Sequence, residues 1–156
     1  MKELKAIVVD TTCLIGLENI GGIHILMELF DTVIVPSSVK VEFEKPGLTL
    51  PGEFTVLMAK QGLDLGLGKG ETEVIGLALE MGGVLAALDD LKARNVALRL
   101  GIRTVGVLGL LVKVKKAGII ELVEPAINEM RQSNFRVSNE LYAKVLELAN
   151  EGKRSY

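Results

Sequence analysis

Short apolar runs alternate along this chain with segments whose apolar residues recur every three or four positions. The runs indicate buried strands and occur at residues 6–9, 32–35, 84–88 and 102–105, with a further candidate at 119–123. Helical spacing occurs at residues 23–30, 39–43, 74–79, 93–100 and 108–117. Because the runs at residues 6–9, 33–35 and 84–88 are continuously apolar, we expect both faces of the sheet to be covered. The pattern predicts an α/β fold with a parallel sheet of four to five strands flanked by helices.

Proline, serine and glycine mark the ends of several predicted elements. Pro36 stops the second strand, and Ser37 or Ser38 can cap the helix that follows it. A pair of glycines closes the helix predicted over residues 74–79. Most of the irregular sequence falls within residues 47–69, so we expect a long connection there.

The pattern changes from Pro125 onward, where two helices are expected near residues 125–133 and 138–150. The second helix carries an apolar stripe made of Leu141, Val145, Leu148 and Ala149. We therefore divide the chain into a domain at residues 1–124 and a C-terminal helical appendage at residues 125–156 that packs on it.

Composition supports a single core and narrows the function classes. The chain has 156 residues, of which 49% are hydrophobic and only 4% aromatic, so the core is aliphatic. Its formal net charge of −2 supplies no global basic field, so nucleic-acid binding needs a local patch or a metal. One cysteine suits a reducing compartment. The chain contains no run of about 18 apolar residues, which is the length needed to span a membrane. We expect a cytoplasmic protein without a membrane segment.

Acidic residues follow or open several of the predicted elements. They are Asp10 after the first strand, Glu42 in the helix opened by Pro36, Glu71 at a helix start, and Asp89 and Asp90 after the strand at residues 84–88. The carboxyl ends of parallel strands share one edge of a sheet, and ligands bind in the crevice there. Each acid alone would be interpreted as a helix cap or a solvated side chain. Their combination predicts one acidic site, with the position of Glu71 depending most on topology.

Carboxylates that lie close together repel one another, and a divalent cation relieves that repulsion. Oxygen ligands alone favour Mg²⁺ or Mn²⁺. With one histidine and one cysteine in the chain, a zinc site built from nitrogen and sulfur is excluded. A metal held in this way, together with water, can hydrolyse a phosphodiester bond.

Other features of the sequence are weaker candidates for a functional role. The glycine-rich segment at residues 62–70 fails the phosphate-loop pattern, because Leu63 and Gly70 stand where that pattern needs glycine and a hydroxyl. Cys13 lacks a nearby histidine and is interpreted as a small buried residue. Cations also flank the acids, at Lys69, Lys92 and Arg94. They are either ordinary surface residues or contacts for substrate phosphates.

Four segments carry a family resemblance. Residues 8–15, 33–43, 65–73 and 88–94 resemble, in this order, the four acidic motifs of PIN domains. Residues 103–110 are similar to the stretch that follows in one archaeal and bacterial, VapC-like subgroup, and residues 134–142 are similar to its C-terminal helical tail. The chain departs from the family pattern at Thr12, where serine or asparagine is usual, and at Val107, where many members have threonine.

The resemblance implies a metal-dependent ribonuclease in which the acids hold one or two Mg²⁺ or Mn²⁺ ions and act on an RNA substrate. It also implies a toxin of a VapBC-like toxin–antitoxin pair, inhibited by an antitoxin protein, and a homodimer. Glu71 and Glu73 are two residues apart on a helix, so both cannot face one metal. We favour Glu71, because it shares a face with Ile75 and Ala78, and we leave Asp89 and Asp90 as alternatives.

Two other functions compete with the nuclease hypothesis. One is a binding or scaffold module of the same fold that has metal affinity but little or no turnover. The other is a response-regulator-like or phosphatase domain, which also gathers aspartates at strand ends. That class needs a lysine after a later strand, and the strand end at residues 105–106 has none.

Overall fold

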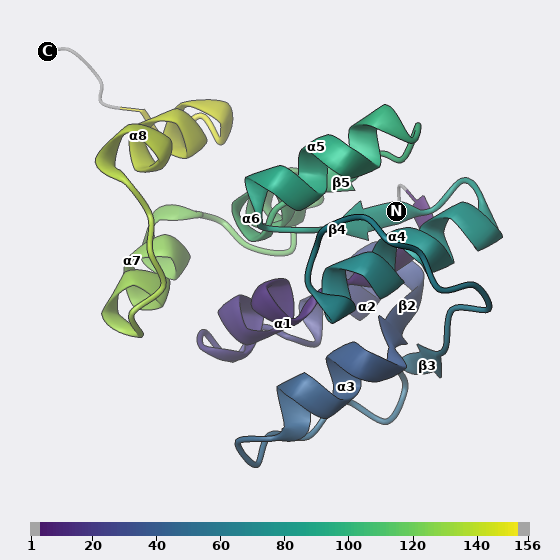
Figure 1. Cartoon of the computed structure of the whole chain (residues 1–156). Coiled ribbons are helices and arrows are strands. Elements are labelled where there is room, and N and C mark those ends of the chain that lie inside the picture. Colours follow the sequence, from purple (N-terminus) through teal and green to yellow (C-terminus); the bar gives the residue numbers. More distant parts are fainter. Residues whose placement is uncertain (1–3, 153–156) are drawn as a thin grey trace, which may run out of the picture.

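The computed structural model describes residues 4–152, and Figure 1 traces the order of the elements. The strands are β1 (Leu4–Val9), β2 (Phe30–Pro36), β3 (Thr55–Leu57), β4 (Leu85–Ala87) and β5 (Thr104–Val105). The helices are α1 (Thr11–Glu18), α2 (Ile25–Leu29), α3 (Ser37–Glu44), α4 (Lys69–Met81), α5 (Leu91–Arg99), α6 (Val107–Lys116), α7 (Glu124–Gln132) and α8 (Asn139–Leu148). The predicted α/β class with a parallel sheet and a helical C-terminal extension is confirmed.

The five strands form one sheet in the order β3-β2-β1-β4-β5, and every neighbouring pair is parallel. β1 is central, with Val8 paired to Ile34 of β2 on one side and to Ala86 of β4 on the other. The chain leaves β1 toward β2 and leaves β4 toward β5, so these two central strands feed connections that run in opposite directions. Such a switch point opens a crevice at the carboxyl ends of the two strands.

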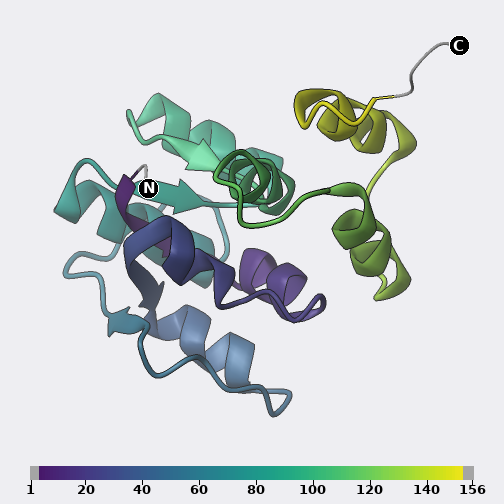
Figure 2. The same cartoon turned by 180° about the vertical axis from the view of Figure 1, so that it is seen from behind.

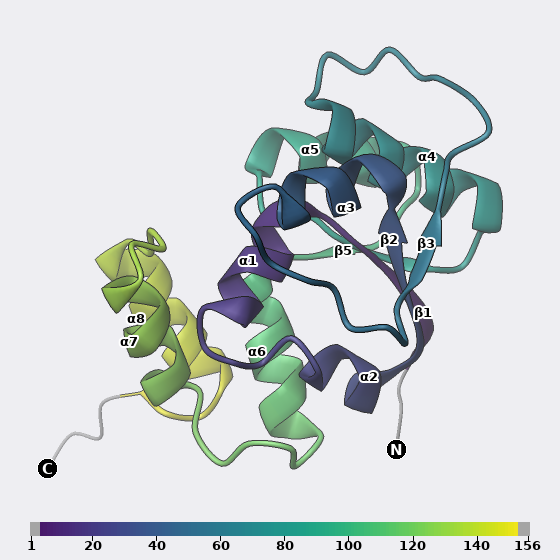
Figure 3. The same cartoon turned by 90° about the horizontal axis from the view of Figure 1, so that it is seen from below.

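Helices cover both faces of the sheet. Figure 3 shows α4 and α5 on one face and α2 and α6 on the opposite face, and Figure 2 shows the same layers from behind. α4 packs against β1, β2 and β4, whereas α2 packs against β2. α3 contacts both α1 and α4 near the edge where the strands end. Covering of both faces explains why the strand sequences are continuously apolar.

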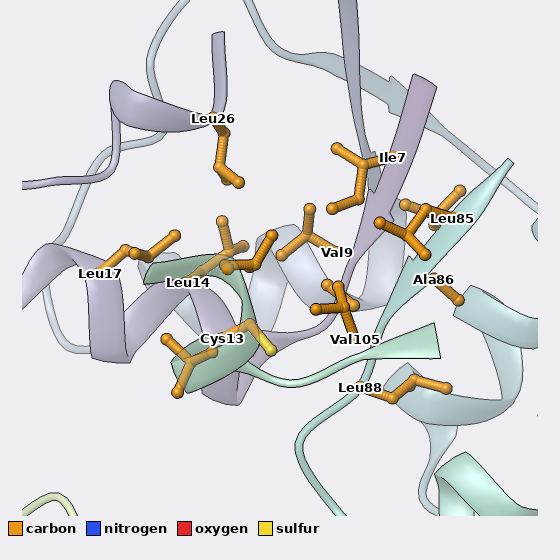
Figure 4. Packing of buried hydrophobic residues seen from close by; sticks show 14 of the residues in the cluster. Ile7, Val9, Cys13, Leu14, Leu17, Leu26, Leu85, Ala86, Leu88 and Val105 are labelled. Carbon is orange, nitrogen blue, oxygen red and sulfur yellow. The ribbon is translucent and has the colours of Figure 1, made fainter. Parts of the chain in front are cut away.

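The core between these layers is aliphatic, as the composition indicates. Figure 4 shows Ile7 and Val9 of β1 among leucines and valines from the neighbouring strands and helices. Ile7, Val9 and Leu14 are fully buried. Cys13 is also fully buried among these side chains and has no disulfide. A rigid, well-packed sheet of this kind fixes the positions of the residues that follow each strand.

Two strand predictions were wrong. Residues 119–123 are not a strand, because the Ile119 N–H bonds back to the Val114 carbonyl at the end of α6 and the Val123 N–H donates to Glu151. The fifth strand is instead β3, which lies in the segment that was expected to be irregular. All three β3 residues are exposed at the sheet edge, so the apolar signal of a buried strand is missing there.

The C-terminal helices lie to one side of the sheet, as Figures 1 and 3 agree. α8 packs on α6 and buries Val145, Leu146 and Ala149. The predicted stripe was partly wrong, since Leu141 and Leu148 are 42% and 55% exposed. The end of the described chain is held by Glu151, which accepts the N–H groups of residues 123 and 124 and pairs with Lys115 at 3.0 Å. None of the described helices is long and apolar enough to cross a membrane.

Candidate functional site

Asp10 occupies the switch point of the sheet. Its backbone N–H continues the β1–β4 ladder to the Ala87 carbonyl at 3.0 Å, and its side chain caps α1 by accepting the Cys13 N–H at 2.8 Å. The residue is only 3% exposed. Burial raises the pKa of Asp10 to about 6, despite the hydrogen bonds that favour its charged form. Asp10 is therefore a buried carboxylate, and within residues 4–152 it forms no ion pair.

Asp89 is the nearest acidic neighbour of Asp10. Its backbone N–H donates to the second Asp10 oxygen at 3.2 Å, which ties the end of β4 to the end of β1. Its own carboxylate accepts the Val107 N–H at 3.3 Å, at the start of α6. The charge of Asp89 adds to the upward shift of the Asp10 pKa. The structure thus brings these two predicted acids together at the switch point.

Asp90 has a different surrounding. It is exposed and caps α5, since its side chain accepts the Ala93 N–H at 3.0 Å. The sequence left Asp89 and Asp90 as alternatives, and the structure separates their surroundings. Asp89 contacts Asp10, whereas Asp90 acts electrostatically on Glu71. Asp89 is consequently the better candidate for a ligand shared with Asp10.

Glu71 lies on the same edge of the sheet. α4 starts after the long loop that leaves the carboxyl end of β3, which settles the topology that the sequence left open. Partial burial raises the pKa of Glu71, and the negative charges of Asp90 and Glu42 add to that shift. Its side chain reaches back to the Gly68 N–H at 3.3 Å and caps α4. Glu42 is exposed on α3, so its carboxylate can move.

Glu73 is held in a structural role. Its carboxylate accepts the Ser38 N–H at 2.9 Å and the Ser38 hydroxyl at 2.8 Å, and it also accepts the Ser37 hydroxyl and the Ala59 N–H. Burial alone would raise its pKa, but these hydrogen bonds together lower the pKa of Glu73. Glu73 thus joins α4 to the start of α3 and to the chain after β3, which leaves Glu71 as the glutamate of α4 without such partners.

Thr11 is a residue of this edge that the sequence did not single out. It is buried, and its hydroxyl has no hydrogen-bond partner within the described part of the chain. Thr12, which the sequence marked for its hydroxyl, is exposed instead. A side-chain carbon on Gly70 would lie 3.2 Å from Val39 Cγ2, which is a tight contact, and 3.7 and 3.9 Å from a Glu42 oxygen and the Thr11 hydroxyl. Glycine at position 70 therefore keeps space open between α1, α3 and α4.

Basic side chains border the acids. Arg94 is partly buried on α5, and its Nε has no hydrogen-bond partner among the described residues. Both its guanidinium and the Asp89 carboxylate lie beside Gly106, at 3.5 and 3.2 Å from the place of a side-chain carbon there. Lys92 donates to the Gly66 carbonyl at 3.1 Å and partly offsets the raised pKa of Glu71. Positive charge is thus available next to the acids.

The structure also limits nucleophilic chemistry by Cys13. Burial, followed by the charge of Asp10, raises the pKa of the Cys13 thiol well above its usual value. A thiol that stays protonated and fully buried is a poor nucleophile. Cys13 contributes its backbone N–H to Asp10 and its side chain to the core.

The acids are suitable ligands for a divalent cation and lie on one edge of the sheet, but their carboxylates are too far apart to coordinate one ion as they stand. Within residues 4–152 no group of three or more acidic, histidine or cysteine side chains is close enough to hold a metal ion. The carboxylates of Asp10, Asp90 and Glu71 each accept a backbone N–H three residues away, and Asp89 accepts the Val107 N–H at the start of α6. The oxygen-only donors, the unpartnered Thr11 hydroxyl and the space kept by Gly70 all suit a hard cation.

Comparison with known proteins gives one family. A family model described as a PIN domain matches residues 6–151, which is most of the chain. No curated protein matches the chain significantly, and neither does any solved structure.

Proposed function

Because the chain belongs to the PIN domain family, whose members are generally metal-dependent nucleases, we propose that it is a ribonuclease that uses Mg²⁺ or Mn²⁺. The observation that carries the proposal is the pair of Asp10 and Asp89 at the switch point, where a buried carboxylate has no cationic partner among residues 4–152. A nuclease site needs such acids next to groups that hold phosphate.

We propose that Asp10, Glu42, Glu71 and Asp89 hold the metal, with Asp90 close to Glu71. Asp10 is fixed by its hydrogen bonds to Cys13 and Asp89, so it supplies a preset oxygen. The bound metal would lower the pKa of a water molecule and stabilise charge on the phosphate oxygens. Exposed Glu42 can turn toward the others, and Glu71 can leave its contact with Gly68.

Two basic residues would hold the substrate. Arg94 lies beside Asp89 at Gly106, where a terminal nitrogen of its guanidinium can donate a charge-assisted hydrogen bond to a phosphate. Lys92 lies on the Glu71 side of the site, where its ammonium can contact a neighbouring phosphate. These cations offset the repulsion between the carboxylates and the RNA backbone.

The test is cleavage of mixed single-stranded and structured RNAs by the purified full chain in Mn²⁺, in Mg²⁺ or in EDTA. We expect cleavage with either metal and none with EDTA. A DNA of the same sequence serves as the substrate control. Cleavage that persists in EDTA, or that prefers DNA, would overturn the proposal.

The resemblance of residues 103–110 and 134–142 to a VapC-like subgroup supports finer proposals. We propose that the protein is a cytoplasmic toxin, that it forms a homodimer and that an antitoxin protein blocks its acidic site. Light scattering of the purified chain measures its oligomeric state. Growth arrest on expression, relieved by a neighbouring gene product, tests the toxin proposal.

We also propose that residues 1–124 contain the site and that residues 125–156 are a helical appendage. The appendage contributes no acid to the site, and α8 packs on α6 rather than on the sheet. A chain that ends at Ser133 should lose stability and solubility while the acidic edge still binds Mn²⁺. A stable, soluble and inactive truncated chain would mean that the tail serves substrate binding and is not needed for packing.

The alternative is a PIN-fold binding or scaffold module with metal affinity but little turnover. One observation favours it, namely that no three ligands of the described part are within reach of one metal. The two functions differ in one measurable way. A scaffold module would be stabilised by Mn²⁺ and would still leave every RNA intact.

A further inference from the structure

A cavity of about 640 Å³ opens next to the acidic site. It is lined by Asp89 and Arg94, by residues of α6 and α8, and by Phe135 and Arg136 of the segment that joins α7 to α8. Asp89 therefore belongs both to the acidic site and to this groove. A polymer that places a phosphodiester at Asp10 and Asp89 can extend directly into the space between the two helices.

Positive charge is concentrated along this groove. Its cationic lining residues are Arg94, Lys113, Lys116, Arg136 and Lys144. Asp89 is the one acidic residue among the described residues that line it. The whole chain carries a net charge of −2, so the excess of positive charge is local. A groove of this sign next to carboxylates is complementary to a ligand with repeated negative charge.

Apolar side chains of the groove are exposed as well. Leu141 and Leu148 line it and are 42% and 55% exposed, although a helix packed on a domain usually buries such residues. Phe135 is half-buried near the start of α6, where its ring packs near Gly16 of α1 and close to Val107, whose N–H donates to Asp89. A second cavity, of about 810 Å³, adjoins it and is lined by Phe135, Arg131 and Arg136.

Phe135 differs from every other phenylalanine of the chain. Phe30, Phe43 and Phe54 are all buried in the core. An aromatic face beside two arginines and a row of cations is the arrangement with which proteins bind single-stranded nucleic acid, because bases stack on the ring while cations bind the phosphates. An acidic peptide would use the cations and the leucines but has no need of continuity with Asp89.

We propose that the groove between α6 and α8 binds the stretch of single-stranded RNA that flanks the cleaved bond, with Phe135 stacking on a base and Arg136 and Lys144 contacting phosphates. The proposal rests on the proposed function, since it names where the substrate of that site lies. It assigns the C-terminal helices to substrate binding, beyond their packing on α6.

The first test measures binding of fluorescent single-stranded RNA by the full chain in EDTA, so that cleavage does not interfere. The double variant Arg136→Ala, Lys144→Ala should bind at least about tenfold more weakly than the wild type. The slope of log Kd against log salt should fall by about 0.7 for each phosphate that the variant no longer binds. Both residues are exposed, and the melting temperature of the variant serves as the folding check.

Arg99→Ala is the matched control. Arg99 is an exposed arginine in the last turn of α5 and does not line the groove. Arg99→Ala is compared with the single variant Arg136→Ala, because each removes one positive charge, whereas the double variant removes two. We expect wild-type affinity and an unchanged salt slope for Arg99→Ala and weaker binding for Arg136→Ala. Equal weakening by Arg99→Ala would mean that only net charge matters, and it would overturn the proposal.

The second test separates stacking from packing at Phe135. Phe135→Leu keeps an apolar side chain near Gly16 but removes the aromatic face, and it should weaken RNA binding by about fivefold or more. Phe135→Tyr keeps the face and should bind like the wild type. Equal affinity of the leucine variant and the wild type would overturn the stacking contact.

The outcomes distinguish this inference from the proposed function. RNA binding that depends on the groove, in a chain that cleaves no RNA, would overturn the nuclease and leave the groove assignment standing. Metal-dependent cleavage combined with wild-type RNA binding by the double variant would overturn the groove assignment alone. If a glutamate-rich helical peptide loses affinity for the double variant while RNA does not, the groove binds a protein partner and the inference is wrong.

Discussion

α4 contributes Glu71 to the edge of the sheet that holds Asp10, and it contributes Glu73 to the contact with α3. The pKa values of the carboxylates shift in opposite directions in these two regions. At the first, burial raises the pKa of Asp10 to about 6, and that of Glu71 is also raised. At the second, several donors from Ser37, Ser38 and Ala59 lower the pKa of Glu73. The residue types are the same, but only the second region supplies enough hydrogen bonds to stabilise the charge.

Hydrogen bonding of the charge therefore distinguishes a structural carboxylate from a candidate metal ligand. Glu73 has its charge satisfied by the protein, so removing it costs stability. Burying the charged carboxylate of Asp10 costs free energy, and the hydrogen bonds that it accepts do not fully offset that cost. Such a site is a candidate for binding an external cation. Substitutions that change one region at a time test whether this difference holds.

The largest effect is expected from Asp10→Asn on RNA cleavage in Mg²⁺. Asparagine keeps the volume and one oxygen for the Cys13 N–H, but it removes the charge that we propose holds the metal. We expect the rate to fall by about a thousandfold, at the upper end of what loss of one charge-stabilising group costs. Single-turnover cleavage and circular dichroism of the variant check the rate and the fold together. Cleavage at the wild-type rate would remove Asp10 from the site.

The pH dependence of stability should have opposite signs in the two regions. Because its folded pKa is raised from 3.8 to about 6, Asp10 destabilises the metal-free protein as pH rises from about 4 to 6, by about 3 kcal/mol in full. Glu73 stabilises it above pH 4.5, and that contribution is lost as pH falls through its lowered folded pKa. Denaturation of wild type and Asp10→Asn in EDTA should show the variant gaining relative stability between pH 4 and 7. A difference between the two that is constant with pH would contradict this account.

A smaller effect is expected from Glu73→Gln. The amide keeps one acceptor for the Ser38 N–H but loses the charge that strengthens these bonds, so the free energy of unfolding should fall by about 2 kcal/mol. The variant should still cleave RNA when it is assayed well below its melting temperature. Thermal melting measures the loss of stability, and cleavage at about 25 °C measures the activity that is retained. A stable but inactive Glu73→Gln protein would exchange the roles of Glu71 and Glu73.

The positions of Asp10 and Asp89 could be predicted from the sequence, because the rule that governs them is topological. Asp10 and Asp89 follow apolar runs directly, and a parallel sheet brings such positions to one edge. The choice between Glu71 and Glu73 was different, since helical spacing shows only that they face apart. What separates them is contact with Ser38 of another helix, which no local pattern contains.

Other features depend on long-range contacts in the same way. β3 is exposed at the sheet edge, so it lacks the apolar run by which strands were recognised. The mostly apolar residues 119–123 follow the end of α6. The Val123 N–H donates to the side chain of Glu151, 28 residues further along the chain, and not to a neighbouring strand. Leu141 and Leu148 have the spacing of a packed stripe, yet they line the groove because α8 meets α6 through Val145 and Leu146.

The central claim is that the Asp10 edge, and not the Glu73 region, binds a divalent cation. The most direct test is the change in melting temperature on adding Mn²⁺ to wild type, Asp10→Asn and Glu73→Gln. A metal at a hundredfold excess over its Kd stabilises the folded state by about 2.7 kcal/mol. We predict that rise for wild type and Glu73→Gln and its loss in Asp10→Asn. No shift in the wild type, or an equal shift in Asp10→Asn, would contradict the account.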